Sequence, residues 1–250
     1  MTRAVRPKPG NAPGPRSGRR LPGEMRPIHF RADYIRTAPG SCLIEVGHTR
    51  VLCTATVDER VPPHKKESGD GWVTAEYAML PGSGSTRVPR DRARGGRSME
   101  IQRLVGRSMR SVVDLAKLGA RTIYIDCDVL QADGGTRCAA VTGGYVALAR
   151  ALAALARRGE LAGNPLTGAV AAVSVGIVRG APFLDLDYGE DAEAEVDMNV
   201  VMTDKGRFVE LQGTAEKAAF GKRDLDRLLR LAGEGIARLL ELQAKHLPST

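Results

Sequence analysis

The sequence QADGGTRCA, residues 131–139, joins two glycines, a hydroxyl and an arginine between a short apolar run and an alanine-rich stretch. This order predicts a turn between a strand and a helix. Gly134 and Gly135 let the backbone approach a ligand closely. Thr136 and Arg137 fall at the expected helix N-terminus, where unpaired N–H groups and the helix dipole favour an anion. Because an arginine fork matches phosphate oxygens in pairs, the loop is interpreted as a phosphate site. A plain turn with a solvated arginine is the alternative.

A second glycine–arginine pair occurs at residues 95–97, directly before another expected helix. We therefore expect Arg97 to make a second anion contact at a helix N-terminus. Further along the same helix, Arg103, Arg107 and Arg110 lie three and four residues apart, so they share one face. Together they predict a basic surface next to the phosphate site.

Residues 183–197, FLDLDYGEDAEAEVD, contain seven acids and no base. Asp191 and Asp197 are six residues apart, which keeps them on one face if the chain is extended. Hard divalent cations such as Mg²⁺ prefer carboxylate oxygens, and a carboxylate pair beside a phosphate loop is typical of metal-assisted phosphoryl chemistry. We expect a metal at Asp191 and Asp197, with Asp185 and Asp187 as the next candidates. An acidic, solvated hairpin is the alternative.

Other common sites have no support in the sequence. The glycines at 213 and 221 lack the spacing of a Walker loop, and no GxGxxG follows a strand. No serine or cysteine nucleophile pattern occurs. The four histidines show no zinc spacing. The four cysteines, at 42, 53, 127 and 138, form no CxxC pair and lie mostly in apolar runs, so we expect reduced thiols in a cytoplasmic protein.

The net charge of +8 is concentrated in two blocks. Residues 1–26 carry seven Lys or Arg and one Glu, and residues 82–110 carry eight Arg, one Asp and one Glu, so each block has a net charge of +6. The rest of the chain is therefore net −4. Localised positive charge indicates a polyanionic partner.

Periodicity predicts a mixed α+β protein. A β-hairpin is expected around residues 47–49, a mobile loop over 82–98, and a disordered basic tail over 1–22 ahead of one domain, 23–250. No apolar run is judged long enough to span a bilayer. After the hairpin, strands are expected at 72–80, 121–129, 168–178, 182–187, 196–203 and 207–211. Helices are expected at 99–119, 138–158 and 224–247.

Several of these segments resemble the bacterial ribonuclease PH family. They include CTATVDERVPP, GWVTAEYAMLP, GRSMEIQRLVGRSMR, TIYIDCDVLQADGGTR, VDMNVVMT and FVELQGTAE, and the likeness runs from about Pro22 to Leu247. The resemblance implies a single domain with the βαβα fold of ribosomal protein S5 domain 2. It also implies a homo-hexamer, built as a trimer of dimers, that binds RNA rather than DNA or a membrane.

The resemblance also implies roles for single residues. Gly135, Thr136 and Arg137 match the family's phosphate cradle, and Arg97 matches a second phosphate and RNA contact. Asp191 and Asp197 match the acid pair near the metal. The arginines that would hold RNA are Arg87, Arg90, Arg97 and Arg103, the first two in the loop that grips tRNA. Gly82 stands where the family usually places an arginine, which puts one tRNA contact in doubt.

The implied activity is phosphorolytic 3′→5′ removal of nucleotides from tRNA 3′ ends and other RNA. Inorganic phosphate is the co-substrate, Mg²⁺ assists, and no organic cofactor is needed. Arg137, Asp191 and Asp197 would be the catalytic residues. Two alternatives remain: a non-catalytic ring subunit that only binds RNA, and a metal-dependent hydrolase that releases monophosphates.

Overall fold

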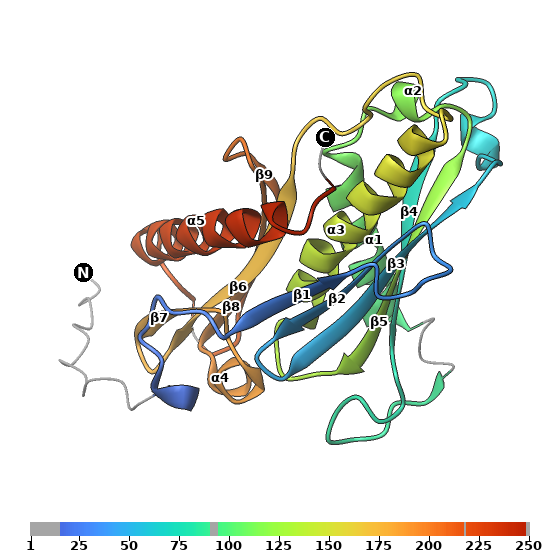
Figure 1. The fold of residues 1–250 in the computed structure, drawn as a ribbon. Helices are drawn as coiled ribbons and strands as arrows, with labels where there is room; N and C mark the ends of the chain where they lie inside the picture. The colour runs from blue at the N-terminus through green and yellow to red at the C-terminus, as the bar shows by residue number, and fades with distance from the viewer. Residues whose placement is uncertain (1–15, 91–94, 218, 249–250) are drawn as a thin grey trace.

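The computed structural model describes residues 16–90, 95–217 and 219–248. Its strands and helices form two sheets with helices packed on and between them (Figure 1). The strands are β1 (Ile28–Ala32), β2 (Gly40–Val46), β3 (Thr49–Asp58), β4 (Trp72–Met79), β5 (Thr122–Gln131), β6 (Val170–Val178), β7 (Ala181–Leu184), β8 (Val196–Thr203) and β9 (Phe208–Ala215). The α-helices are α1 (Gly96–Arg110), α2 (Leu115–Leu118), α3 (Thr136–Arg157), α4 (Tyr188–Glu193) and α5 (Lys222–Ala244).

The first sheet has the order β1-β2-β3-β5-β4, antiparallel except for the parallel pair β4–β5. Successive side chains along β3 and β5 alternate between the buried face and the outer face of the sheet, as the two-residue period of a strand requires. Cys42, Cys53 and Cys127 are direct cross-strand neighbours on that buried face. Helices α1 and α3 cover it, so this sheet and its helices form the larger core.

The second sheet has the order β7-β6-β8-β9 and is antiparallel throughout. Helix α5 packs across it through buried apolar side chains that include Leu228, Ile236 and Leu239. Helix α3 lies between the sheets and packs on β2 and β3 on one side and β6 on the other (Figure 1). Its N-terminus is thereby brought to the place where the two sheets meet.

The α+β prediction is confirmed, and most predicted elements are present at nearly the expected residues. Three details were wrong. The expected helix from 99 begins at Gly96 and ends at Arg110, and a separate short helix, α2, then ends at Leu118 with Gly119 as its C-cap. Strand β1 was not predicted. The strand expected over 182–187 ends at Leu184, because Asp185 has a left-handed φ of 55° and helix α4 soon follows.

The folded protein begins earlier in the sequence than predicted. Residues 1–15 and part of the loop 82–98, at 91–94, lie outside the described residues. The correction concerns residues 16–22, expected to be disordered. Arg16 is only 6% exposed, and its Nε donates a hydrogen bond of 2.7 Å to Glu190 Oε1. A buried arginine needs such a partner, so residue 16 is already part of the folded protein.

Within the described residues, α3 is long and apolar enough by length and composition to cross a membrane, which the sequence analysis did not expect. In this structure, 83% of its apolar window is buried inside the protein. The helix is apolar all round because both sheets cover it, as is usual for a core helix.

Candidate active site

The predicted phosphate loop connects β5 to α3. Gly134 and Gly135 both have left-handed φ values, 73° and 68°, which glycine adopts without strain. Gly135 is the N-cap of α3, so the next residues present the free N–H groups of the helix start. Thr136 is buried, and its Oγ1 accepts a hydrogen bond of 2.9 Å from the Tyr77 hydroxyl. A second hydroxyl thus fixes the threonine at the helix entry.

Arg137 points away from the core toward a cavity of about 740 Å³. Its Nη1 donates to Gln212 Oε1 at 2.7 Å and to Glu100 Oε1 at 3.3 Å. These contacts come from β9 and α1, two elements that flank the cavity. The guanidinium is therefore held at the cavity wall with donors left for an anion.

The second glycine–arginine pair reaches the same cavity. Gly95 is the N-cap of α1, and Arg97 in its first turn lines the cavity opposite α3. Burial raises the pKa of Asp191, and the positive charge of Arg97 opposes this rise. The two helix N-termini predicted as separate anion contacts thus converge on one site.

Strands β8 and β9 supply a polar wall. Asp197 pairs with Thr214, and Asn199 pairs with Gln212, in the antiparallel register. Residues two apart on a strand share a face, and all four side chains line the cavity. Of these four residues, only Asp197 was predicted from the sequence. The alternating polar positions in VDMNVVMT and FVELQGTAE were the available signal, and Glu100, Glu216 and Lys217 were also missed.

Asp191 and Asp197 come together, but not for the predicted reason. They were expected on one face of an extended chain, whereas Asp191 lies on helix α4 and Asp197 on strand β8. Burial raises the pKa of Asp191, against the lowering effect of Arg97 and Arg137. Burial, together with the charge of Asp191, raises the pKa of Asp197 to about 6. The cavity therefore holds two carboxylates whose negative charge is only partly offset.

Two other acids of this segment, Asp185 and Glu190, are bound by arginines of the chain itself. The Arg26 Nε and Nη2 atoms bind Asp185 at 2.9 and 2.6 Å. Arg16 and Arg20 bind Glu190 at 2.7 and 3.0 Å. Asp185 and Asp187, predicted as the next candidate ligands, thus face arginines and lie outside the cavity lining that includes Asp191 and Asp197. The alternative of a solvated acidic hairpin is wrong, because the counter-charges arrive from the N-terminal segment.

The remaining predicted RNA-binding arginines lie outside the cavity. Arg87, Arg90 and Arg103 are exposed, and none of them lines it. Of the other arginines on α1, Arg107 pairs with Glu210. Arg110 donates to the Val73 carbonyl at 2.8 Å and stacks on Trp72. The basic face of α1 is thus partly used for internal contacts.

Comparison with known families agrees with this geometry. Residues 24–153 match the model described as the 3′ exoribonuclease family (RNase PH), domain 1, and residues 168–235 match domain 2 of the same family. The chain belongs to the 3′ exoribonuclease family. The family is described as two domains, whereas the sequence analysis treats 23–250 as one. Helix α3 packs against strands of both parts.

Solved structures share the fold of this chain. An Archaeoglobus fulgidus exosome with RNA bound to the active site has a TM-score of 0.79 at 20% identity, covering 91% of this chain and 92% of that one. Rice (Oryza sativa) Rrp46 has a TM-score of 0.73 at 17% identity, covering 92% and 98%. An archaeal exosome core has 0.73 at 21% identity, covering 90% and 89%.

Proposed function

We propose that this chain is a ribonuclease PH-type phosphorylase that removes nucleotides from RNA 3′ ends with inorganic phosphate and releases nucleoside diphosphates. The observation that carries the proposal is the convergence of two arginine-bearing helix N-termini and a carboxylate pair on one cavity. A hydrolase needs no binding site for free phosphate, so the built anion site favours phosphorolysis.

Arg137, Thr136 and the first N–H groups of α3 would hold the attacking phosphate. An oxygen of this phosphate attacks the phosphorus of the last phosphodiester. The bond from phosphorus to the 3′ oxygen breaks, and that oxygen takes up a proton. The products are a shortened RNA with a free 3′ hydroxyl and a nucleoside diphosphate. Because one phosphoester is exchanged for one diphosphate, we expect the reaction to be reversible.

The residues present fit a hard divalent cation. Mg²⁺ is usually held by one or two carboxylates plus substrate phosphates and water, and the exposed Asp191 and the half-buried Asp197 line the same cavity as Arg137 of the phosphate loop. No group of three candidate ligands occurs among the described residues. When bound, Mg²⁺ would offset charge on the reacting phosphoryl group.

A carboxylate that ligates Mg²⁺ is ionised, so Asp197 is the stronger candidate for the proton donor to the leaving 3′ oxygen when Asp191 alone holds the metal. Burial and the charge of Asp191 raise the pKa of Asp197 to about 6, and general acids work best with a pKa near the operating pH. The pKa of Asp191 is also raised by burial, but Arg97 and Arg137 are the largest influences after it and act in the opposite direction. Arg97 would position the RNA end opposite the phosphate.

We further propose that the protein works in the cytoplasm on tRNA 3′ ends as a hexameric ring. Arg87, Arg90 and Arg103 would hold the RNA backbone without reading bases, and their exposure is consistent with this role. The ring is supported by similarity to the exosome structures, one of which carries RNA at its active site. The tRNA substrate rests on the resemblance of the basic loop to ribonuclease PH.

The test is chromatography of the nucleotides released from a 3′-labelled tRNA precursor, with and without phosphate. Phosphate-dependent release of nucleoside diphosphates is the expected result. Monophosphates released equally in phosphate-free buffer would instead identify a hydrolase. Binding without any release would identify a non-catalytic RNA-binding subunit.

A further inference from the structure

Arg26 lies behind the cavity and joins three segments that are distant in sequence. Its backbone N–H and its Nε donate to Asp185 Oδ2 at 2.8 and 2.9 Å, and its Nη2 donates to Asp185 Oδ1 at 2.6 Å. Its Nη1 donates to the backbone carbonyl of Asp133, in the phosphate loop. Arg26 is only 7% exposed and Asp185 3%. One guanidinium therefore ties the N-terminal segment, the end of β7 and the phosphate loop together.

The phosphate loop and the start of α4 are also packed backbone to backbone. A Cβ on Gly134 would lie 2.6 Å from the Asp187 carbonyl carbon and 2.8 Å from the Tyr188 nitrogen. The Tyr188 N–H in turn donates to Asp133 Oδ1 at 3.4 Å. Gly135 faces Arg26 from the other side, since its Cβ would lie 3.1 Å from Nη2. The loop is thus held between Arg26 and the first turn of α4.

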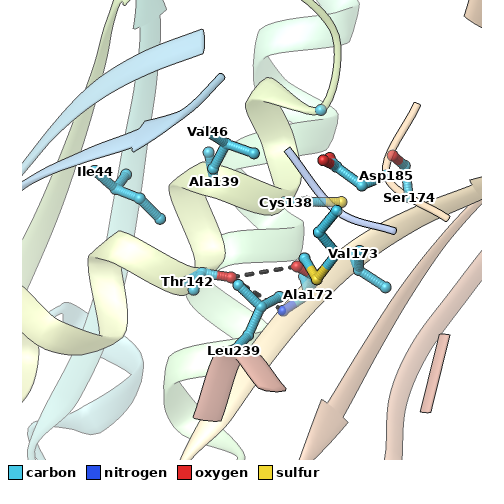
Figure 2. Close-up of a pocket in the computed structure, with 12 residues that line it drawn as sticks. Ile44, Val46, Cys138, Ala139, Thr142, Ala172, Val173, Ser174, Asp185 and Leu239 are labelled. Atoms are coloured by element: carbon cyan, nitrogen blue, oxygen red, sulfur yellow. Dashed lines mark hydrogen bonds between the residues drawn. The ribbon is translucent and has the colours of Figure 1, made fainter. Parts of the chain in front are cut away.

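Asp185 occupies the joint between these parts. Its φ of 55° is unusual for a residue with a side chain, and its backbone N–H donates to Ser174 on β6 at 2.7 Å. In Figure 2, Asp185 and Ser174 lie beside the first turn of α3, close to Cys138. A strained backbone persists only where its surroundings hold it, and here Arg26 supplies three of the bonds, two from its guanidinium and one from its backbone N–H.

Two parts of the site extend from Asp185 and its partners, and we call them the phosphate-binding arm and the carboxylate arm. The phosphate loop leads directly into α3 with Thr136 and Arg137, and residues 186–188 lead into α4 with Asp191. We propose that Arg26 and Asp185 are positioning residues that set the phosphate-binding arm against the carboxylate arm. This inference rests on the proposed function. A lysine keeps the charge at position 26 but not the planar fork, so it cannot hold Asp185 and Asp133 together.

Arg16 offers a matched control on one arm. It is equally buried and binds Glu190 on α4 through Nε and Nη2, at 2.7 and 2.9 Å. Its remaining bonds go to backbone carbonyls at 21, 22, 24, 184 and 185. It makes no hydrogen bond to the phosphate loop. Arg16→Lys should therefore disturb α4 and the overall stability but leave the bond from Arg26 to the Asp133 carbonyl in place, so it should affect phosphate affinity much less than Arg26→Lys does.

The experiment compares the full-length wild type, Arg26→Lys, Asp185→Asn and Arg16→Lys. Binding of radiolabelled inorganic phosphate is measured by equilibrium dialysis, and phosphorolysis of a short RNA gives kcat and separate KM values for phosphate and RNA. Thermal melting is recorded for each protein. For Arg26→Lys and Asp185→Asn we expect phosphate binding and KM for phosphate to weaken by about tenfold or more, because small misplacements of binding groups carry such losses. The KM for RNA should change less than about twofold, and Arg16→Lys should lose much less phosphate affinity at a comparable loss of melting temperature.

Two outcomes separate this inference from the proposed function. Wild-type phosphate affinity in both Arg26→Lys and Asp185→Asn overturns the positioning role, whatever their stability. An equal loss of phosphate affinity in Arg16→Lys overturns it too, because the effect would then be general loosening. If Arg26→Lys fails to fold, the isosteric Asp185→Asn decides. A wild type that binds phosphate but releases no diphosphates contradicts the proposed function alone, since dialysis still tests the pair.

Discussion

The acidic segment 183–197 divides into two groups with opposite electrostatics. Asp185 and Glu190 bind arginines from the N-terminal segment at 2.6–2.9 Å. The pKa of Asp187 lies below its usual value: although burial opposes this, bonds from Glu190 and Ser17 and the charges of Arg20 and Arg26 outweigh it. Asp191 and Asp197 have no ion pair within the described residues, and burial raises the pKa of both.

The difference shows what a run of acids can and cannot indicate. In the first group, the chain's own arginines compensate the charge, and the result is a rigid joint. In the second group the charge is left for something the chain does not supply, such as a cation or a proton. Both groups have the same side-chain type within one short segment, so only the location of the arginines distinguishes them.

The largest expected effect is loss of activity in the second group. Asp191→Asn and Asp197→Asn should each lower kcat by at least about 100-fold in both phosphorolysis and diphosphate-driven extension, because each removes a carboxylate proposed to hold the Mg²⁺ that offsets charge on the reacting phosphates. Single-turnover assays with a short RNA measure this. Glu193→Gln is the control, since Glu193 belongs to the same segment but pairs with Arg179 at the surface. Equal losses in the control would show that the division is wrong.

Stability should respond most strongly in the first group. Asp185→Ala leaves the buried Arg26 without its carboxylate, and removing one partner of a buried pair costs about 3–5 kcal/mol. Urea unfolding at neutral pH measures this loss of unfolding free energy. Asp191→Ala should stay within about 1 kcal/mol of the wild type or become more stable. Comparable losses at both positions would contradict the comparison.

Arg137→Ala tests the arginine that faces the second group. We expect the barrier to rise by about 3 kcal/mol, because a charge-assisted contact to the attacking phosphate is lost. Affinity for RNA should remain close to that of the wild type, measured by fluorescence anisotropy. Normal turnover at saturating phosphate would reduce Arg137 to a surface arginine.

A smaller effect concerns pH and stability. The pKa of Asp197 is raised to about 6 in the folded state, above an unfolded value of about 3.9. The folded state therefore binds the proton more tightly, so the free energy of unfolding should fall as pH rises from about 4 to about 6 and stay level above. Asp197→Asn removes this fall. In EDTA it should be more stable than the wild type by on the order of 2 kcal/mol at pH 7.5, and no more stable near pH 4. Parallel curves for the two proteins would refute the assignment.

The smallest effect should come from the exposed loop. Replacing Arg87 and Arg90 together by Ala should weaken binding of a folded tRNA precursor, with the salt slope falling by roughly one unit per lost phosphate contact. Phosphorolysis of a short single strand should change little, because neither residue lines the cavity. Arg97→Ala should impair both substrates. Equal failure of the double variant on the short strand would place the loop in the active site.

Local signals in the sequence were enough to locate one side of the site. Glycine before a helix is such a signal, and it identified Gly135, Arg137 and Arg97. Helix α4 also has a local signal, because Asp187 and Glu190 form a capping box. The sequence there was nevertheless interpreted as an extended chain. The partner of Asp185 lies 159 residues away, and nothing local indicates such a pair. Gln212 and Thr214 are placed by strand register, which periodicity alone does not fix across strands.

Three cysteines packed beneath α3 allow opening of the core to be measured by their chemical modification. Cys42, Cys53 and Cys127 stand side by side on three strands and are at most 1% exposed. Burial raises the pKa of Cys42 to about 12, and thiols react as thiolates. An alkylating reagent therefore reaches them only when α3 lifts from the sheet. Their labelling rate in the native protein therefore measures how often α3 opens, and no cysteine has to be introduced for the measurement.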